Sequence, residues 1–165
     1  MKKLKKFRAV LVLICLIAVG MSDAGLAAAK EGPPAPTSGT ASTDPDYGET
    51  IKIVNPLTTK YIKDWNIYIK KISDNYIKIG GYTASYSASD SIGLKLFLQS
   101  WNESSSQWED IDGKEWVASS SDYVSGAREY DVESGYYYRV RGVHYVLESG
   151  TKEQVEDISG YLYID

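Results

Sequence analysis

Cysteine, histidine and phenylalanine are scarce in this sequence. The 165 residues include one cysteine, one histidine and two phenylalanines. Cys15 lies in an apolar N-terminal run, so the rest of the chain has no thiol and must fold without an internal disulfide. His144 is the only histidine, and no Ser–His–Asp or Cys–His arrangement can be traced around it. We therefore expect a protein that is not an enzyme.

Positive charge is also scarce beyond the N-terminus. The chain has 18 basic and 22 acidic residues, and five of the basic residues stand within the first eight positions. No cluster of lysine and arginine follows. Contacts with phosphate need such clusters, so we expect no nucleic-acid partner.

The first 29 residues have the three-part pattern of a secretory signal peptide. A basic start precedes the apolar run 9–19, and the small residues 27–29 follow it. A membrane-spanning helix needs about 20 apolar residues, which is more than this run provides. We therefore expect residues 1–29 to be removed, the protein to be secreted into the extracellular space, and no stable membrane insertion afterwards.

Residues 30–48 are rich in Pro, Gly, Ser and Thr. Four of the five prolines of the chain lie here, at positions 33, 34, 36 and 45. A segment with so few apolar residues cannot bury enough surface to offset the entropy of ordering, so we expect a disordered linker. Residues 49–165 then form a single folded domain.

The domain shows the alternation of apolar and polar residues that is typical of β-strands. In the clearest strand, 92–101, the residues Ile92, Leu94, Leu96 and Leu98 share one face. Asp112–Gly113 predicts a type I′ hairpin turn, Ser149–Gly150 another turn, and Gly80–Gly81 a bulge or a close backbone approach. The strands that this pattern predicts span 66–72, 76–85, 92–101, 107–111, 114–117, 129–132, 136–147 and 159–164.

About seven short strands in roughly 100 residues predict an all-β fold, an antiparallel β-sandwich of the immunoglobulin or fibronectin type. One of the residues Tyr136, Tyr137 and Tyr138 is a candidate for the corner tyrosine of such folds. A small barrel is the alternative.

Two segments carry a resemblance to a known group of proteins. They are IGLKLFLQSWNESSSQWEDI (92–111) and GYYYRVRGVHYVLESGTKE (135–153). They resemble a family of small, functionally uncharacterised secreted proteins of Gram-positive bacteria. The resemblance covers most of residues 60–165 and implies export and a β fold, with no catalytic residue to transfer.

The aromatic residues give the strongest functional signal, because the chain has 14 tyrosines and 4 tryptophans. Such amphipathic rings favour surfaces that are dry on one side and wet on the other. If strands 92–101 and 136–147 are neighbours, their outer faces form one platform that exposes Phe97, Trp101, Tyr137, Arg139, Arg141 and Tyr145. Alternatively, a linker, a loop or a second protomer covers these rings, or Tyr–Arg pairs only stabilise the sheet.

The turn predicted at Asp112–Gly113 concentrates carboxylates. In a two-residue hairpin loop, Asp110 would face Glu115 across the strands, with Asp112 at the turn. Calcium prefers such hard oxygen ligands and would relieve the repulsion. Asp110, Asp112 and Glu115 are therefore candidate calcium ligands, a solvated acidic turn is the alternative, and we expect no other cofactor.

Two classes of function fit these observations. The first is a secreted, non-catalytic binding module that recognises a cell-surface glycan or protein through the platform. The second is a structural or matrix protein that self-associates through an exposed strand edge and its tyrosines.

Overall fold

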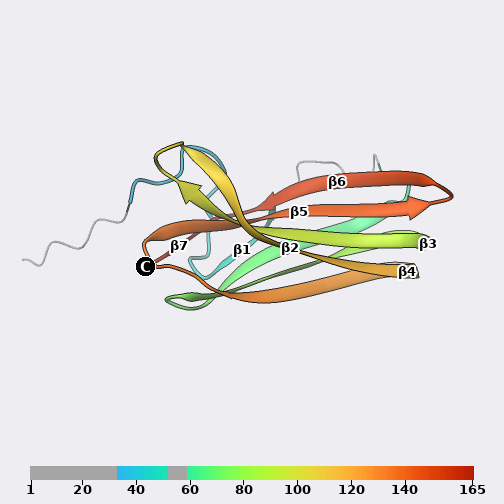
Figure 1. The fold of residues 1–165 in the computed structure, drawn as a ribbon, viewed down its shortest axis with the longest axis horizontal. Coiled ribbons are helices and arrows are strands. Elements are labelled where there is room, and N and C mark those ends of the chain that lie inside the picture. The colour runs from blue at the N-terminus through green and yellow to red at the C-terminus, as the bar shows by residue number, and fades with distance from the viewer. Residues whose placement is uncertain (1–32, 52–58) are drawn as a thin grey trace, which may run out of the picture. The chain divides into compact units, whose positions relative to one another are not determined.

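All regular structure in the described part of the chain is β-strand. The computed structural model describes residues 33–51 and 59–165, and Figure 1 shows arrows and turns there but no helix. The predicted signal peptide lies outside these ranges, and the all-β prediction is confirmed. The strands are β1 (Tyr47–Ile51), β2 (Ile62–Ser73), β3 (Tyr76–Asn102), β4 (Gln107–Asp131), β5 (Tyr136–Glu148), β6 (Thr151–Ser159) and β7 (Leu162–Ile164).

Two strands are much longer than the sequence pattern predicts. β3 has 27 residues and joins two predicted strands, and β4 has 25 residues. The predicted turn at Asp112–Gly113 is wrong, because both residues pair with β3 in mid-strand. The β3–β4 turn lies at residues 103–106 instead. The glycine serves packing: a Cβ at Gly113 would lie 2.9 Å from the ring of Phe97. By contrast, the predicted turn at Ser149–Gly150 is present, with φ values of 50° and 77°.

The seven strands belong to one antiparallel sheet in the order β4-β3-β2-β1-β6-β5-β7. Because β3 also pairs with β5, the strands β3, β2, β1, β6 and β5 form a closed circuit of pairings. The two-sheet immunoglobulin or fibronectin arrangement is not confirmed. The closed circuit is nearer to the alternative of a small barrel.

An irregularity within the continuous strand β3 lets the sheet fold over itself. The first part of β3 pairs with β2 and the last part with β5, and the register with β4 shifts between Ala84 and Ser89. As a result, distant parts of β4 meet. Asp112 and Arg128 form a 3.0 Å ion pair, and a Cβ at Gly126 would lie 2.1 Å from the ring of Trp116.

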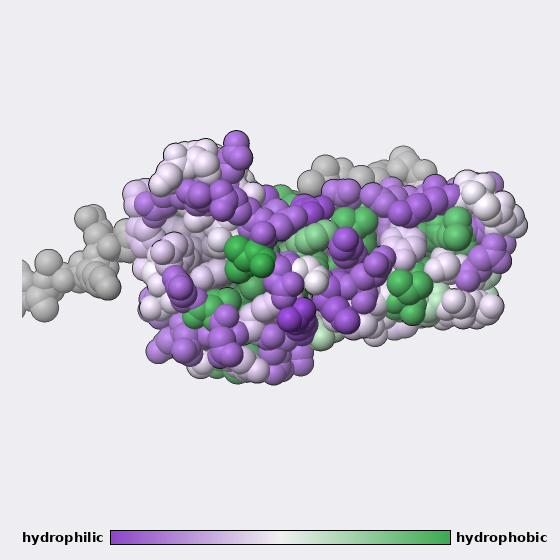
Figure 2. Space-filling model, viewed as in Figure 1, coloured by the Kyte–Doolittle hydropathy of each residue, from purple (hydrophilic) through white to green (hydrophobic). Residues whose placement is uncertain are grey.

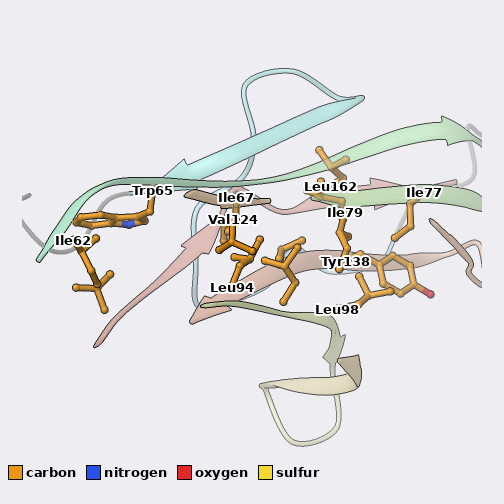
Figure 3. Packing of buried hydrophobic residues seen from close by; sticks show 14 of the residues in the cluster. Ile62, Trp65, Ile67, Ile77, Ile79, Leu94, Leu98, Val124, Tyr138 and Leu162 are labelled. Atoms are coloured by element: carbon orange, nitrogen blue, oxygen red, sulfur yellow. The ribbon is translucent and has the colours of Figure 1, made fainter. Parts of the chain in front are cut away.

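The core fills the space within the folded sheet (Figure 3). The predicted inner residues Ile92, Leu94, Leu96 and Leu98 are all 0% exposed, so that prediction is confirmed. Burying a side chain of this size contributes about 1.5–3 kcal/mol. The hydroxyl of Tyr138 donates a 2.9 Å hydrogen bond to the carbonyl of Glu133, the contact expected of a corner tyrosine.

The carboxylate of Glu153 on β6 fastens the start of β2. Its oxygens accept hydrogen bonds from the backbone N–H groups of Lys60, Tyr61 and Ile62, at 2.6, 2.7 and 2.7 Å. Burial raises the pKa of Glu153, but the three backbone donors outweigh it, so its pKa is lower than usual.

We expect Glu153→Gln to lower the free energy of unfolding at pH 7 by roughly 1.5–3 kcal/mol, because charge-assisted bonds to three backbone donors are lost. A carboxyl group whose pKa is lower in the folded state stabilises above the unfolded pKa, about 4.3. That contribution disappears as the pH falls through the folded pKa. The loss should therefore shrink in urea denaturation at pH 3. Glu156→Gln on the same strand is the control, and equal losses for both variants at pH 7 would contradict the assignment.

Candidate functional site

The predicted neighbours β3 and β5 are paired, and their register sets the platform. Phe97 lies opposite Arg141, and Gln99 lies opposite Arg139. The alternate residues Leu96, Leu98 and Val140 are buried in the core, so the platform residues lie on the outer face. The structure thus places Phe97, Trp101, Tyr137, Arg139, Arg141 and Tyr145 on one face of two adjacent strands.

Phe97 and Arg141 form the centre of this face. The guanidinium carbon of Arg141 lies 4.0 Å from the ring centroid of Phe97, and the ammonium of Lys95 lies 4.7 Å from it. Arg141 also donates a 2.6 Å hydrogen bond to Asp110 and approaches Glu156 at 3.5 Å. Two cations therefore flank a half-buried ring, an arrangement that fixes all three side chains.

Arg139 contacts Gln99 and Trp108. Its Nε donates to Gln99 at 2.7 Å, Gln99 donates to Asp110 at 2.7 Å, and its guanidinium carbon lies 4.3 Å from the centroid of Trp108. Burial, aided by the charge of Arg141, lowers the pKa of Arg139 to about 10. The group is still protonated at neutral pH, and its charge points into the protein face rather than into solvent.

Tyr145 lies flat on the sheet over a glycine. A Cβ at Gly93 would stand 2.1 Å from the phenol ring, so only glycine leaves room for it. The hydroxyl donates a 2.9 Å hydrogen bond to Glu115, and the ammonium of Lys152 lies 4.6 Å from the ring centroid. Burial and the bond to Glu115 raise the pKa of Tyr145 to about 12.

Trp101 differs from the prediction. The sequence places it in solvent on the platform, whereas its side chain is only 5% exposed. It lies in an aromatic cluster whose neighbouring rings contact one another. The distances between ring centroids are 5.4 Å for Trp101–Trp108, 5.7 Å for Trp108–Tyr161, 5.6 Å for Tyr137–Tyr161 and 5.0 Å for Tyr137–Tyr163. The aromatic cluster is hereafter Trp101, Trp108, Tyr137, Tyr161 and Tyr163.

Three members of the aromatic cluster were not found from the sequence: Trp108, Tyr161 and Tyr163. Trp108 lies directly opposite Trp101 on β4, and Tyr163 opposite Tyr137 on β7. These cross-strand pairs follow only from the register, which the sequence does not specify.

A segment from the predicted linker covers this cluster. We call residues 33–46 the strap. The hydroxyl of Tyr137 donates to the carbonyl of Pro33 at 3.0 Å, and the indole N–H of Trp108 donates to the carbonyl of Ser38 at 3.0 Å. The expectation of a disordered linker is therefore wrong for these residues.

The strap is also joined to the backbone beside β7. Ser42 donates to the carbonyl of Tyr161 at 3.0 Å, and Tyr161 donates to the carbonyl of Thr40 at 2.9 Å. Ala41 and Tyr161 form an isolated parallel bridge. Of the alternatives for the platform, covering by the linker therefore applies to its Trp101 and Tyr137 end.

The candidate calcium ligands do not converge. Asp110 bonds to Gln99 and Arg141, and Glu115 accepts from Tyr145. Asp112 pairs with Arg128 and accepts the N–H of Gly113. Within residues 33–51 and 59–165 there is no group of three or more His, Cys, Asp or Glu arranged to hold a metal ion. The calcium prediction gains no support from this geometry.

His144 is part of a buried polar chain that the sequence did not reveal. Its Nδ1 lies 2.8 Å from the hydroxyl of Thr83, and its Nε2 lies 3.3 Å from Asp157. The side chains of His144 and Asp157 are 0% exposed. The order of groups is that of a nucleophile, a base and an acid. However, no substrate can reach a chain of groups sealed within the core, so the arrangement is structural.

Comparison of the chain with family models, with curated proteins and with solved structures finds no match of any of the three kinds. The resemblance to small secreted Gram-positive proteins therefore gains no support. None of the described residues forms a helix of the length and apolarity that crossing a bilayer requires.

Proposed function

We propose that the protein is a secreted, non-catalytic binding module that recognises a cell-surface glycan or protein through the part of the platform that the strap leaves open. The observation that carries this proposal is the arrangement of Phe97, Arg141 and Tyr145, half-buried side chains held in place on the paired strands β3 and β5. Export is proposed from the N-terminal pattern of residues 1–29.

Rigid aromatic rings with adjacent cations suit recognition of a sugar. The half-buried rings of Phe97 and Tyr145 would give apolar contacts to the C–H groups of a pyranose, beside the cations Arg141 and Lys152 that lie over them. Lys95 and Arg141 supply N–H donors for sugar hydroxyls or carboxylates beside them. Since their contacts already fix these side chains, little conformational entropy is lost on binding.

The surface shown in Figure 2 is more typical of a small, polar binding site than of a large hydrophobic interface. On the side that it shows, hydrophobic residues form separate green patches surrounded by hydrophilic ones. Obligate protein interfaces are usually larger and more continuous apolar surfaces.

The proposal is tested with arrays of cell-wall glycans and of cell-surface proteins. Phe97→Leu keeps most of the apolar volume but removes the flat ring, and we expect it to weaken binding at least tenfold. Tyr123→Leu, at a ring that is 50% exposed on β4, is the matched control and should bind like the wild type. Absence of wild-type binding on both arrays, or equal binding by Phe97→Leu, would contradict the proposal. Binding to the protein array alone would assign the partner as a protein.

Self-association is the second candidate function, and the edge of β4 favours it. Among the described strands, β4 pairs with β3 alone and ends the strand order. Its exposed Ile111, Val117 and Tyr123 have exposed fractions of 50%, 53% and 50%. A free edge of this length offers unpaired N–H and C=O groups to another strand. Sedimentation at increasing concentration should then show oligomers that Val117→Lys abolishes, and a monomer at all concentrations would eliminate this candidate.

A further inference from the structure

The aromatic cluster contacts the strap through the polar ends of its rings. The hydroxyl of Tyr137 and the indole N–H of Trp108 donate to strap carbonyls, those of Pro33 and Ser38, at 3.0 Å each. Carbonyls are the only backbone groups through which proline can form hydrogen bonds, since it lacks an N–H. The cluster therefore offers hydrogen-bond donors, which a backbone that contains proline can accept through its carbonyls.

The half-buried prolines of the strap are spaced with the period of a polyproline II helix. Pro33 and Pro36 are half-buried, whereas Pro34 and Ala35 between them are exposed. Proline fixes its own φ near −65° and favours extended backbone in the residue before it, so Pro33–Pro36 is biased toward this conformation. A polyproline II helix has three residues per turn, which places positions 33 and 36 on one face.

Gly39 fits the strap against the far side of the cluster. Its φ is +91°, and a Cβ there would lie 3.1 Å from Nη1 of Arg139 and 3.4 Å from Nε1 of Trp108. A larger residue would be strained in this conformation and would push the strap away from the indole. The close contact with Arg139 and Trp108 therefore requires glycine at position 39 of the strap, in addition to the prolines.

We propose that the aromatic cluster is a binding site for uncharged, proline-rich extended peptides, and that the strap fills it in cis. Aromatic-lined grooves bind polyproline II segments in other proteins, and here the ring donors of Trp108 and Tyr137 bind two strap carbonyls. Residues 33–43 carry no charged side chain, which matches a surface whose arginine is already engaged. This inference is independent of the open part of the platform.

A tethered occupant masks the site from added peptide. Short tethers give effective concentrations in the millimolar range. A peptide in trans can therefore bind only when the strap has been released. The test uses the chain from Lys30 onward and a fluorescent peptide of the uncharged residues 33–43 as the probe.

Gly39→Val should release the strap and raise the affinity for this peptide at least tenfold over the wild type, with a change in tryptophan fluorescence. Gly150→Val is the matched control. Gly150 also has a positive φ, of +77°, but nothing lies within 4 Å of its Cβ position, so this variant should bind no better than the wild type. Adding Trp108→Phe to Gly39→Val removes the indole donor and should weaken peptide binding again.

A second variant that should release the strap keeps the proposal testable if Gly39→Val does not fold. The double variant Pro33→Ala/Pro36→Ala changes only the strap, and it should also bind the wild-type peptide. Circular dichroism and a cooperative melt establish that each variant is folded. The proposal is overturned if the folded variants bind the peptide no better than the wild type does. It is also overturned if a peptide with Ala in place of Pro33 and Pro36 binds as tightly as the original.

Discussion

Replacing Trp101 with Ala is expected to lower the free energy of unfolding by about 3–5 kcal/mol. The indole is 5% exposed and packs on Trp108 at a centroid distance of 5.4 Å, so its removal leaves a cavity beside Trp108. The cost should match that of Leu96→Ala, about 2–5 kcal/mol, although Leu96 lies on the inner face of the sheet. Urea denaturation of both variants measures the two losses.

Tyr86→Ala is the control for this comparison. Tyr86 is 58% exposed, and its loss should change stability by no more than about 0.5 kcal/mol. If Trp101→Ala is as mild as Tyr86→Ala, the indole stands in solvent and is not packed in the aromatic cluster.

Asp157→Ala should be as costly, about 3–5 kcal/mol, because it leaves a buried histidine without one of its partners. Thr83 donates its single hydroxyl proton to the carbonyl of Gly93 at 3.0 Å, so Nδ1 of His144 must be the donor in the 2.8 Å contact with Thr83. The 3.3 Å contact of Nε2 with Asp157, which is 1% exposed, then needs a second proton, carried either by Nε2 or by the carboxyl group.

A double variant separates the loss of a partner from the loss of volume. Replacing both members of a buried polar pair by apolar residues is often nearly neutral. We therefore expect His144→Leu/Asp157→Leu to unfold at a higher urea concentration than Asp157→Ala. Additive losses, or a cost below about 1 kcal/mol for Asp157→Ala, would show that the two side chains are not coupled.

The inner face of the sheet could be predicted because its signal is local. The alternation from Ile92 to Leu98 has one explanation, a strand with one buried face, and the burial agrees at all four apolar positions. The same alternation in residues 136–147 predicted the outward positions of Arg139, Arg141 and Tyr145. Local periodicity is sufficient here, since each residue's side of the sheet follows from its parity alone.

The turn at Asp112–Gly113 was predicted wrongly because a local signal competed with a distant contact. The dipeptide suits a tight turn. In the folded protein, however, Gly113 lies beneath Phe97, and Asp112 bonds to Arg128 from the other end of the same strand. Neither partner is near in sequence, so no window around the dipeptide could reveal them.

The strap could not be predicted for a related reason. Its composition correctly indicates that it buries little apolar surface, and most of its residues are exposed. What orders it is a few hydrogen bonds, to ring donors on Trp108 and Tyr137 and to the backbone of Tyr161, all far along the chain. The composition of a segment indicates how much apolar surface it can bury. It does not reveal hydrogen-bond donors elsewhere in the chain.

The closed circuit of strands has a consequence for the order of folding. The hairpins β2–β3, β3–β4 and β5–β6 each close a short loop, whereas the β1–β6 pairing joins Thr50 and Ile51 to Ser159 and Ile158 near the opposite end of the domain. Loop-closure entropy grows with loop length, so we expect this short seam to form after the hairpins. Because the strap leads directly into β1, we expect it to reach the aromatic cluster after the hairpins have formed.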